Sequence, residues 1–116
     1  MKQVFSAIAY CHSNQVIHRN LRPEVIVFLS PESNEIRVRD FGMSQICIEG
    51  KKLNEISGNV YYVAPEILSG CYDSKSDIWS LGVILYILLS GEPPFDGDTN
   101  EEIHQKILEG KFSCSQ

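Results

Sequence analysis

One segment, residues 74–90, constrains the fold of this chain most, because a helix there is apolar on nearly every face. The pattern predicts a helix that is capped by Ser74 or Ser76 and ends at Gly91. A helix that is apolar all round must be covered on all sides, so we expect it to form the axis of the domain. The apolar run is too short to span a bilayer comfortably, which favours a buried helix.

Composition is that of an ordinary globular protein and excludes one class of partner. The chain has 116 residues, 43% hydrophobic and 22% charged, which fits one domain or part of one. The net charge of −5, without a block of lysine or arginine, argues against a nucleic-acid binder. The cysteines form no C-x-x-C pair, which argues against a zinc site. Because the sequence shows no signal peptide, we expect these thiols to be reduced, in the cytoplasm or the nucleus. These cysteines are Cys11, Cys47, Cys71 and Cys114.

Other segments are predicted as helices that flank the first. Residues 2–13 place apolar side chains at helical spacing. A later helix begins at Thr99, which forms a capping-box pattern with Glu102. Its apolar face is expected to consist of Ile103, Ile107 and Leu108. A short helix over residues 65–69 is also predicted, because a proline opens it and a glycine follows it.

A β-hairpin is predicted between the first helix and the central one. Residues 25–29 are rich in β-branched side chains, residues 36–39 alternate between apolar and polar, and turn-forming residues separate the two runs. The hairpin brings its flanking loops side by side, so we expect Asn20 and Asp40 to face one cleft. The polar stretch 43–57 is expected to be an irregular loop, of a length that is usually functional or mobile.

Four ordered motifs carry a resemblance to a known family. HRNL at residues 18–21 is similar to the H-R-D-L catalytic loop of eukaryotic protein kinases, and DFG at 40–42 and APE at 64–66 match two further kinase signatures. DIWSLG at 77–82 resembles the D-x-W-S-x-G helix of the same family. The runs GNVYYVAPEIL and EEIHQKILEGKF are similar to calcium/calmodulin-dependent and especially calcium-dependent protein kinases of protists and plants.

The resemblance implies a mostly α fold: a partial C-terminal lobe of a protein kinase, with a small β-hairpin that carries the catalytic and DFG loops. Residues 1–116 would run from the helix before the catalytic loop to the helix after the central one. The chain carries no Gly-rich loop and no V-A-I-K lysine, so we expect the N-terminal lobe to be absent, together with the last helices of the C-terminal lobe. The central helix would then keep an uncovered apolar flank, which favours association.

The resemblance also implies an enzyme that uses ATP and magnesium on protein substrates, but the reactive positions depart from the family pattern. Asn20 stands where active members carry the catalytic Asp, and an amide cannot take a proton at neutral pH. Val25 stands at the second magnesium ligand and offers a hard cation no oxygen. Arg22 replaces the loop Lys with a longer, forked cation. Asp40 is retained as a metal and cofactor ligand.

Further residues near the cleft are expected to support it rather than react. Asp77 would bind the backbone of the catalytic loop, or serve only as a carboxylate in the first turn of its helix. His18 would be a packed structural histidine. Arg19 would hold a phosphorylated activation loop, although Asn59 stands where the family has its threonine. Alternative phosphorylation sites in that loop are Ser44 and Ser57.

The substrate-binding loop is expected in the segment that leads into APE. The residues implied by the resemblance are Gly58, Tyr61 and Tyr62. Both tyrosines fit the edge of the core equally well. Glu66 would pair, in the family, with an arginine from outside this chain, so here we expect it to be unpaired and solvated.

Three functions remain open from the sequence. The first is a catalytically impaired, pseudokinase-like fragment that acts as a protein-binding scaffold. The second is part of an active ATP-dependent serine/threonine kinase that phosphorylates protein substrates. The third is a truncated gene product without function. Neither a membrane segment nor a nucleic-acid partner is expected.

Overall fold

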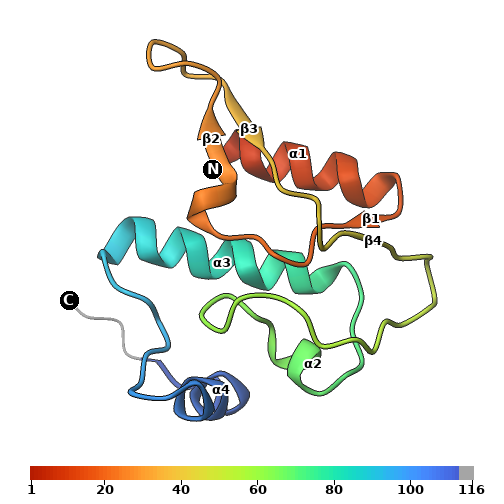
Figure 1. The fold of residues 1–116 in the computed structure, drawn as a ribbon, viewed down its shortest axis with the longest axis vertical. Coiled ribbons are helices and arrows are strands. Elements are labelled where there is room, and N and C mark those ends of the chain that lie inside the picture. The colour runs from red at the N-terminus through yellow and green to blue at the C-terminus, as the bar shows by residue number, and fades with distance from the viewer. Residues whose placement is uncertain (113–116) are drawn as a thin grey trace.

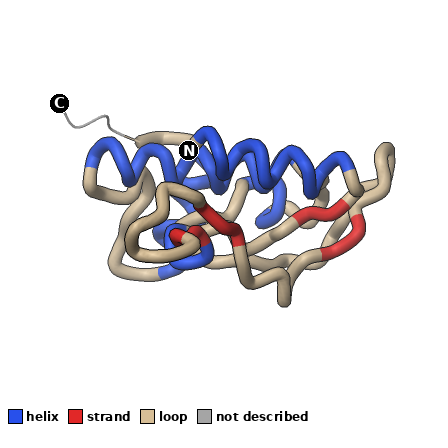
Figure 2. The backbone as a smooth tube through the Cα atoms, turned by 90° about the horizontal axis from the view of Figure 1, so that it is seen from above, coloured by secondary structure: helices blue, strands red, loops and turns tan. Residues whose placement is uncertain are grey.

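The central helix α3, Lys75–Ser90, crosses the middle of the structure, and the other elements pack around it (Figure 1). The computed structural model describes residues 1–112, so Cys114 lies outside the described part. In chain order the other elements are α1 (Lys2–Ser13), β1 (Val16–Ile17), the 3₁₀ turn η1 (Pro23–Val25), β2 (Ile26–Phe28), β3 (Ile36–Val38), β4 (Gln45–Ile46), α2 (Pro65–Leu68) and α4 (Asn100–Glu109). The molecule is flat, 38 × 37 × 21 Å (Figure 2). This mostly helical architecture with a small hairpin agrees with the predicted fold class.

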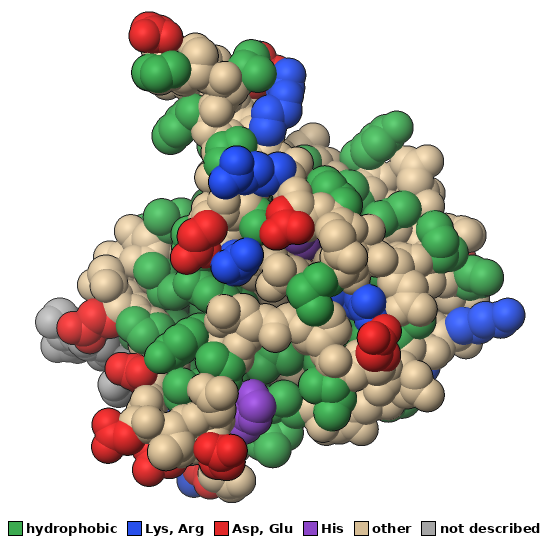
Figure 3. Space-filling model, in the orientation of Figure 1, with side chains coloured by type: hydrophobic (Ala, Val, Ile, Leu, Met, Phe, Trp, Pro, Cys, Tyr) green, Lys and Arg blue, Asp and Glu red, His purple; other side chains and the backbone are tan. Residues whose placement is uncertain are grey.

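The predicted hairpin is confirmed, with shorter strands than expected. β2 pairs antiparallel with β3, so that Ile26 lies opposite Val38 and Phe28 opposite Ile36. Val25, expected in the first strand, ends the 3₁₀ turn instead, because Pro23 opens that turn and the Val25 N–H bonds back to the Arg22 carbonyl at 3.1 Å. The hairpin projects from the body of the molecule, as the space-filling view shows (Figure 3).

The loop 43–57 is better ordered than the sequence indicated. β4 lies within it and pairs antiparallel with β1, with Val16 opposite Ile46. Farther along, Leu53 and Tyr72 exchange two backbone hydrogen bonds of 2.8 and 3.0 Å. The expectation of an irregular loop was therefore wrong at these two places, because strands of two residues and single bridges carry no periodic pattern that a sequence can reveal.

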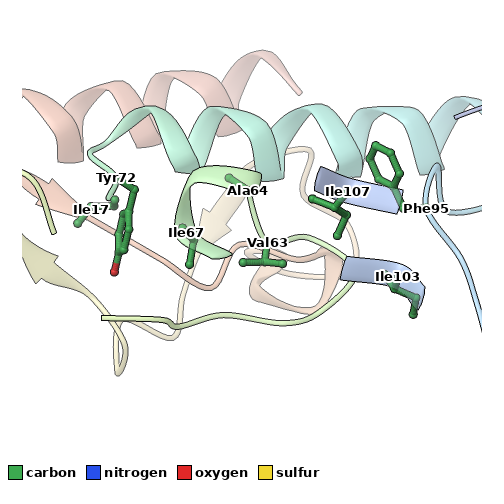
Figure 4. Packing of buried hydrophobic residues seen from close by; sticks show 8 residues of the cluster. All are labelled: Ile17, Val63, Ala64, Ile67, Tyr72, Phe95, Ile103 and Ile107. Atoms are coloured by element: carbon green, nitrogen blue, oxygen red, sulfur yellow. The ribbon is translucent and has the colours of Figure 1, made fainter. Parts of the chain in front are cut away.

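Two hydrophobic clusters hold the elements together. The hairpin-side core joins α1, the catalytic loop and α3, and consists of Val4, Ile8, Leu21, Val25, Leu81 and Ile84. The α4-side core joins β1, α2 and α4, and consists of Ile17, Val63, Ala64, Ile67, Tyr72, Phe95, Ile103 and Ile107 (Figure 4). Residues 18–20 lie between Ile17 of the α4-side core and Leu21 of the hairpin-side core, so both ends of this short segment are fixed by packing.

The central helix is covered on only part of its surface. Leu88 and Leu89 in its last turns are 62% and 80% exposed, and Ile78 is 49% exposed. The expectation that all sides would be covered was wrong, whereas the expected uncovered apolar flank is confirmed. No helix within residues 1–112 is both long and apolar enough to cross a bilayer.

The helix ends confirm some predicted caps and correct others. Thr99 Oγ1 accepts a hydrogen bond from the Glu102 N–H at 3.2 Å, as the capping-box pattern predicts. At α3, Ser74 holds the N-cap position, as one of the two predictions had it, but neither its side chain nor that of Ser76 caps the helix. Asp73 Oδ1 accepts from the Lys75 N–H at 2.9 Å instead. Gly91 and Gly110 both end their helices in the left-handed conformation. In α4 one further expectation was wrong, because Leu108 turns away from the core and is 52% exposed.

Candidate functional site

The catalytic-loop segment, residues 18–25, is anchored by a buried carboxylate from α3. Asp77 is 1% exposed, and its two oxygens accept hydrogen bonds from the backbone N–H groups of His18 and Arg19 at 2.9 and 3.0 Å. His12 Nε2, from the end of α1, lies 2.8 Å from the same carboxylate. Asp77 thus makes the backbone contacts that the kinase resemblance predicts, and it also lies in the first turn of its helix.

His18 connects the catalytic loop to the DFG corner. Its Nδ1 accepts a hydrogen bond from the Asn20 N–H at 3.2 Å, and its Nε2 donates to the Arg39 carbonyl at 2.9 Å. A backbone N–H can only donate and a carbonyl can only accept, so this pair of contacts fits the neutral ring with its proton on Nε2. The fully buried ring also meets Phe41 edge to face, with centroids 4.8 Å apart. The loops that carry Asn20 and Asp40 therefore lie side by side, as expected.

Arg19 is held by an acidic residue that the sequence reasoning missed. Its Nη1 donates to Glu55 Oε2 at 3.0 Å and to the Tyr72 hydroxyl at 3.1 Å, and its Nε donates to the Met43 carbonyl at 2.6 Å. The arginine backbone is left-handed, with φ 67°, and its side chain is 8% exposed. Arg19 thus pairs with a carboxylate of this chain, whereas the resemblance implied a phosphate as its partner. The signal in the sequence was an acidic side chain three residues before Gly58.

Of the predicted phosphorylation sites and Asn59, only Ser44 and Asn59 make local hydrogen bonds within residues 1–112. Ser44 Oγ donates to the Phe41 carbonyl at 2.6 Å, and Asn59 Oδ1 accepts from the Tyr61 N–H at 3.1 Å. Ser57 is 8% exposed, and its hydroxyl has no hydrogen-bond partner within the described residues. The segment is therefore ordered by turn-type contacts of short polar side chains.

The positions that the resemblance assigns to the reaction differ from one another in how far they are exposed to solvent. Asn20 is half-buried and Asp40 is 47% exposed, with a left-handed backbone of φ 62° at Asp40. The Arg22 guanidinium lies 3.7 Å from the Asp40 carboxylate, measured from Nη2 to Oδ2. Val25 is 2% exposed and belongs to the hairpin-side core. The side chain at this position therefore serves packing.

The substrate-loop segment, as we call residues 58–62 after the role that the resemblance implies, lies against the catalytic loop. Gly58 has φ 111°, and a Cβ on it would come within 2.9 Å of the Arg19 carbonyl oxygen, so only glycine fits. Ser80 Oγ, from α3, donates to the Tyr62 carbonyl at 2.8 Å. Tyr61 is half-buried against the α4-side core. Tyr62 packs on the hairpin-side core, and this burial raises the pKa of its phenol.

A groove of about 360 Å³ lies between the substrate-loop segment and α4. Its walls are formed by Ile56, Ser57, Gly58, Asn59, Val60, Val63, Leu68, Asn100 and His104. Neither predicted tyrosine lines it. Glu66 lies outside the groove, half-buried, and forms no ion pair with another described residue.

Comparison with known proteins identifies the family. The sequence model of the protein kinase domain matches residues 1–116. Calcium-dependent protein kinase 5 of Plasmodium berghei is 50% identical over 113 residues, which cover 97% of this chain and 20% of that protein. Its namesake in Plasmodium falciparum is 49% identical over the same length. Calcium-dependent protein kinase 11 of Arabidopsis thaliana is 46% identical over 113 residues, which cover 23% of it.

The chain therefore spans about a fifth of the length of these relatives. The family uses ATP and magnesium and acts on proteins. The four motifs, the anchored catalytic loop and the match over the whole chain lead to one conclusion: the chain belongs to the protein kinase family and is similar to its calcium-dependent members.

Proposed function

We propose that this chain is a catalytically impaired kinase C-lobe that acts through protein binding. The observation that carries the proposal is the contrast within one loop. Asp77 and His18 hold the loop backbone in place, while Asn20 and Val25 occupy the positions of the base and of a metal ligand. The resemblance supplies these two roles, and the structure supplies the surroundings of the residues that now stand there.

Loss of the base alone would slow the reaction strongly. The Asn20 amide can accept a hydrogen bond from a substrate hydroxyl but cannot take its proton. General acid–base groups typically contribute about 10²–10⁴ in rate. Because the loop is already held by other residues, restoring an aspartate at this position would require no rearrangement of the backbone.

The residues present do not fit the magnesium sites of the family. A magnesium ion requires oxygen ligands in near-octahedral geometry. Asp40 supplies one carboxylate, but Val25 supplies no oxygen and is packed in the hairpin-side core. Residues 1–112 hold no cluster of three or more histidine, cysteine or acidic side chains suited to a metal ion. We therefore derive no step through magnesium-bound ATP for this chain.

The groove between residues 56–63 and α4 is the surface that we propose for protein binding. It combines apolar walls from Val60, Val63 and Leu68 with polar side chains from Asn100 and His104. A groove that offers both apolar and polar groups can hold an extended peptide segment, whose side chains and backbone need both. A cytoplasmic or nuclear location for this binding stays a prediction.

Phosphotransfer by the purified chain tests the proposal. The chain is incubated with ATP, magnesium and a basic peptide, beside an Asp40→Ala control. We expect no transfer above that control and no upward thermal shift with ATP and magnesium. Transfer above the control would overturn the proposed impairment and favour part of an active serine/threonine kinase.

Peptide binding tests the scaffold role separately. Fluorescence polarisation with labelled peptides would show binding that is weakened by Val60→Asp in the groove. The matched control is Ile48→Asp, at an exposed apolar position away from the groove. Equal effects of both changes would refute the groove as the binding surface. A chain that aggregates and shows no cooperative unfolding would favour a gene product without function.

A further inference from the structure

The retained DFG carboxylate lies beside a cationic side chain of the same chain. The Arg22 guanidinium lies 3.7 Å from the Asp40 carboxylate, and the two side chains are 32% and 47% exposed. This distance marks an ion pair without a direct hydrogen bond. Guanidinium stays protonated at every pH a folded protein meets, so the positive charge beside Asp40 is permanent.

The position of Arg22 is set by the fold rather than by the ion pair. Arg22 precedes Pro23, which holds it in an extended conformation with φ −159° and ψ 164°. Its Nε is buried and makes no hydrogen bond within the described residues. The arginine therefore retains an unused donor, while its charged end faces the DFG carboxylate.

The surroundings of this pair do not complete a metal site. The neighbouring family position is Val25, whose side chain is 2% exposed in the hairpin-side core. A divalent ion at Asp40 would meet one carboxylate oxygen donor and a fixed positive charge close by. Like charges at such a distance repel each other, and partial exposure reduces this repulsion without removing it.

We infer that Arg22 takes the place of the divalent cation in this cleft. Its guanidinium neutralises Asp40, and the cleft discriminates against Mg²⁺ and Mn²⁺. This inference goes beyond the proposed loss of phosphotransfer, because it concerns metal affinity in the absence of nucleotide and substrate. Arg22 and Val25 then act together: Val25 offers the metal no ligand, and the longer, forked cation at Arg22 lies against the ligand that remains.

Paramagnetic Mn²⁺ is the probe that tests this inference. In two-dimensional NMR spectra of the purified chain, we expect Mn²⁺ to cause no selective broadening of the Asp40, Phe41 and Gly42 amides. Arg22→Gln removes the charge with a side chain of similar reach. We expect this variant to bind Mn²⁺ at the corner roughly tenfold more tightly than the unchanged chain. Arg22→Gln combined with Val25→Asn is expected to bind more tightly still.

Two controls separate this effect from general charge. Arg37→Gln removes an exposed arginine that pairs with Glu35 on the hairpin, and it should leave the Mn²⁺ response unchanged. Adding Asp40→Asn to Arg22→Gln should abolish the gain. Because Val25→Asn changes a buried residue and could unfold the chain, Arg22→Gln alone decides the outcome.

Two results would overturn the inference. One is selective broadening of the Asp40, Phe41 and Gly42 amides by Mn²⁺ in the unchanged chain, at the same Mn²⁺ affinity as in the Arg22→Gln variant. The other is a folded Arg22→Gln variant that gains no affinity. Neither result would restore the base at Asn20, so the proposed catalytic impairment would still be decided by the phosphotransfer assay.

Discussion

The two ends of the catalytic-loop segment differ in what holds them. At the His18–Arg19 end, the backbone N–H groups bond to Asp77, and both side chains make further hydrogen bonds. At the other end, Asn20 and Arg22 are only half-buried, and Val25 is a core residue. The comparison teaches that the shape of a kinase cleft depends on buried hydrogen bonds that do not involve the reacting side chains.

The largest expected effect is at the buried end. Asp77→Ala removes the acceptor for two backbone N–H groups and the carboxylate beside His12. Breaking a buried charged contact typically costs 3–5 kcal/mol, so we expect a loss of about 3 kcal/mol in the free energy of unfolding, measured by urea denaturation. The matched change Asp40→Ala, at a half-exposed carboxylate, should cost less than about 1 kcal/mol. Equal losses would contradict the proposed difference between the two ends.

A smaller loss of stability is expected at the contacts that join Arg19, Glu55 and Tyr72. The Tyr72 hydroxyl donates to the Glu55 carbonyl at 2.6 Å and accepts from Arg19 at 3.1 Å. Tyr72→Phe leaves the ring in the core but removes both bonds, so we expect a loss of about 1–2 kcal/mol. Urea denaturation measures it, with Tyr10→Phe, at a 72% exposed position, as the control. A change no larger than that of the control would show that these bonds contribute nothing net.

The smallest effect concerns the cap of α3 and depends on pH. The Lys52 ammonium, which bonds to Asp73, and the Lys75 N–H hold the pKa of the Asp73 carboxyl below its usual 3.8. A carboxyl whose pKa is lower in the folded than in the unfolded state stabilises the fold at pH values above its unfolded pKa. This stabilisation is lost as the pH falls through the folded pKa.

Asp73→Asn should therefore destabilise the protein at neutral pH by less than about 1 kcal/mol, since Lys52 is exposed to solvent and Asp73 is only partly buried. The difference from the unchanged chain should shrink at pH values below about 4. Thermal unfolding at a series of pH values measures it, with Asp98→Asn as the control. A difference that stays constant down to the lowest pH would mean that the charge of Asp73 does not stabilise the fold.

Much of this arrangement followed from local sequence patterns. The helices were predicted from apolar periodicity, and the hairpin from two β-branched runs around a turn. Asp77 was found because it belongs to a motif. The pairing of β1 with β4 was missed because each strand has two residues, and the contact of Glu55 with Arg19 was missed because it joins residues 36 positions apart.

The exposed part of α3 shows the limit of the same reasoning. Apolar composition indicated a helix that is buried on every side, but the sequence contains too few other elements to cover it, so Leu88 and Leu89 remain exposed. The side chain that caps α3 was also misassigned. Asp73 and Ser74 are both good capping residues, so the sequence alone does not decide which side chain bonds to the Lys75 N–H.

The central claim is that the catalytic-loop backbone is held in place although the base and a metal ligand are missing. Phosphotransfer in a chimera tests this claim most directly. Here this chain replaces the matched segment of calcium-dependent protein kinase 5 of Plasmodium falciparum. A second chimera carries Asn20→Asp, Arg22→Lys and Val25→Asn. We predict that the first transfers phosphate at least about 10²-fold more slowly than the second. Equal rates in two folded chimeras would contradict the account.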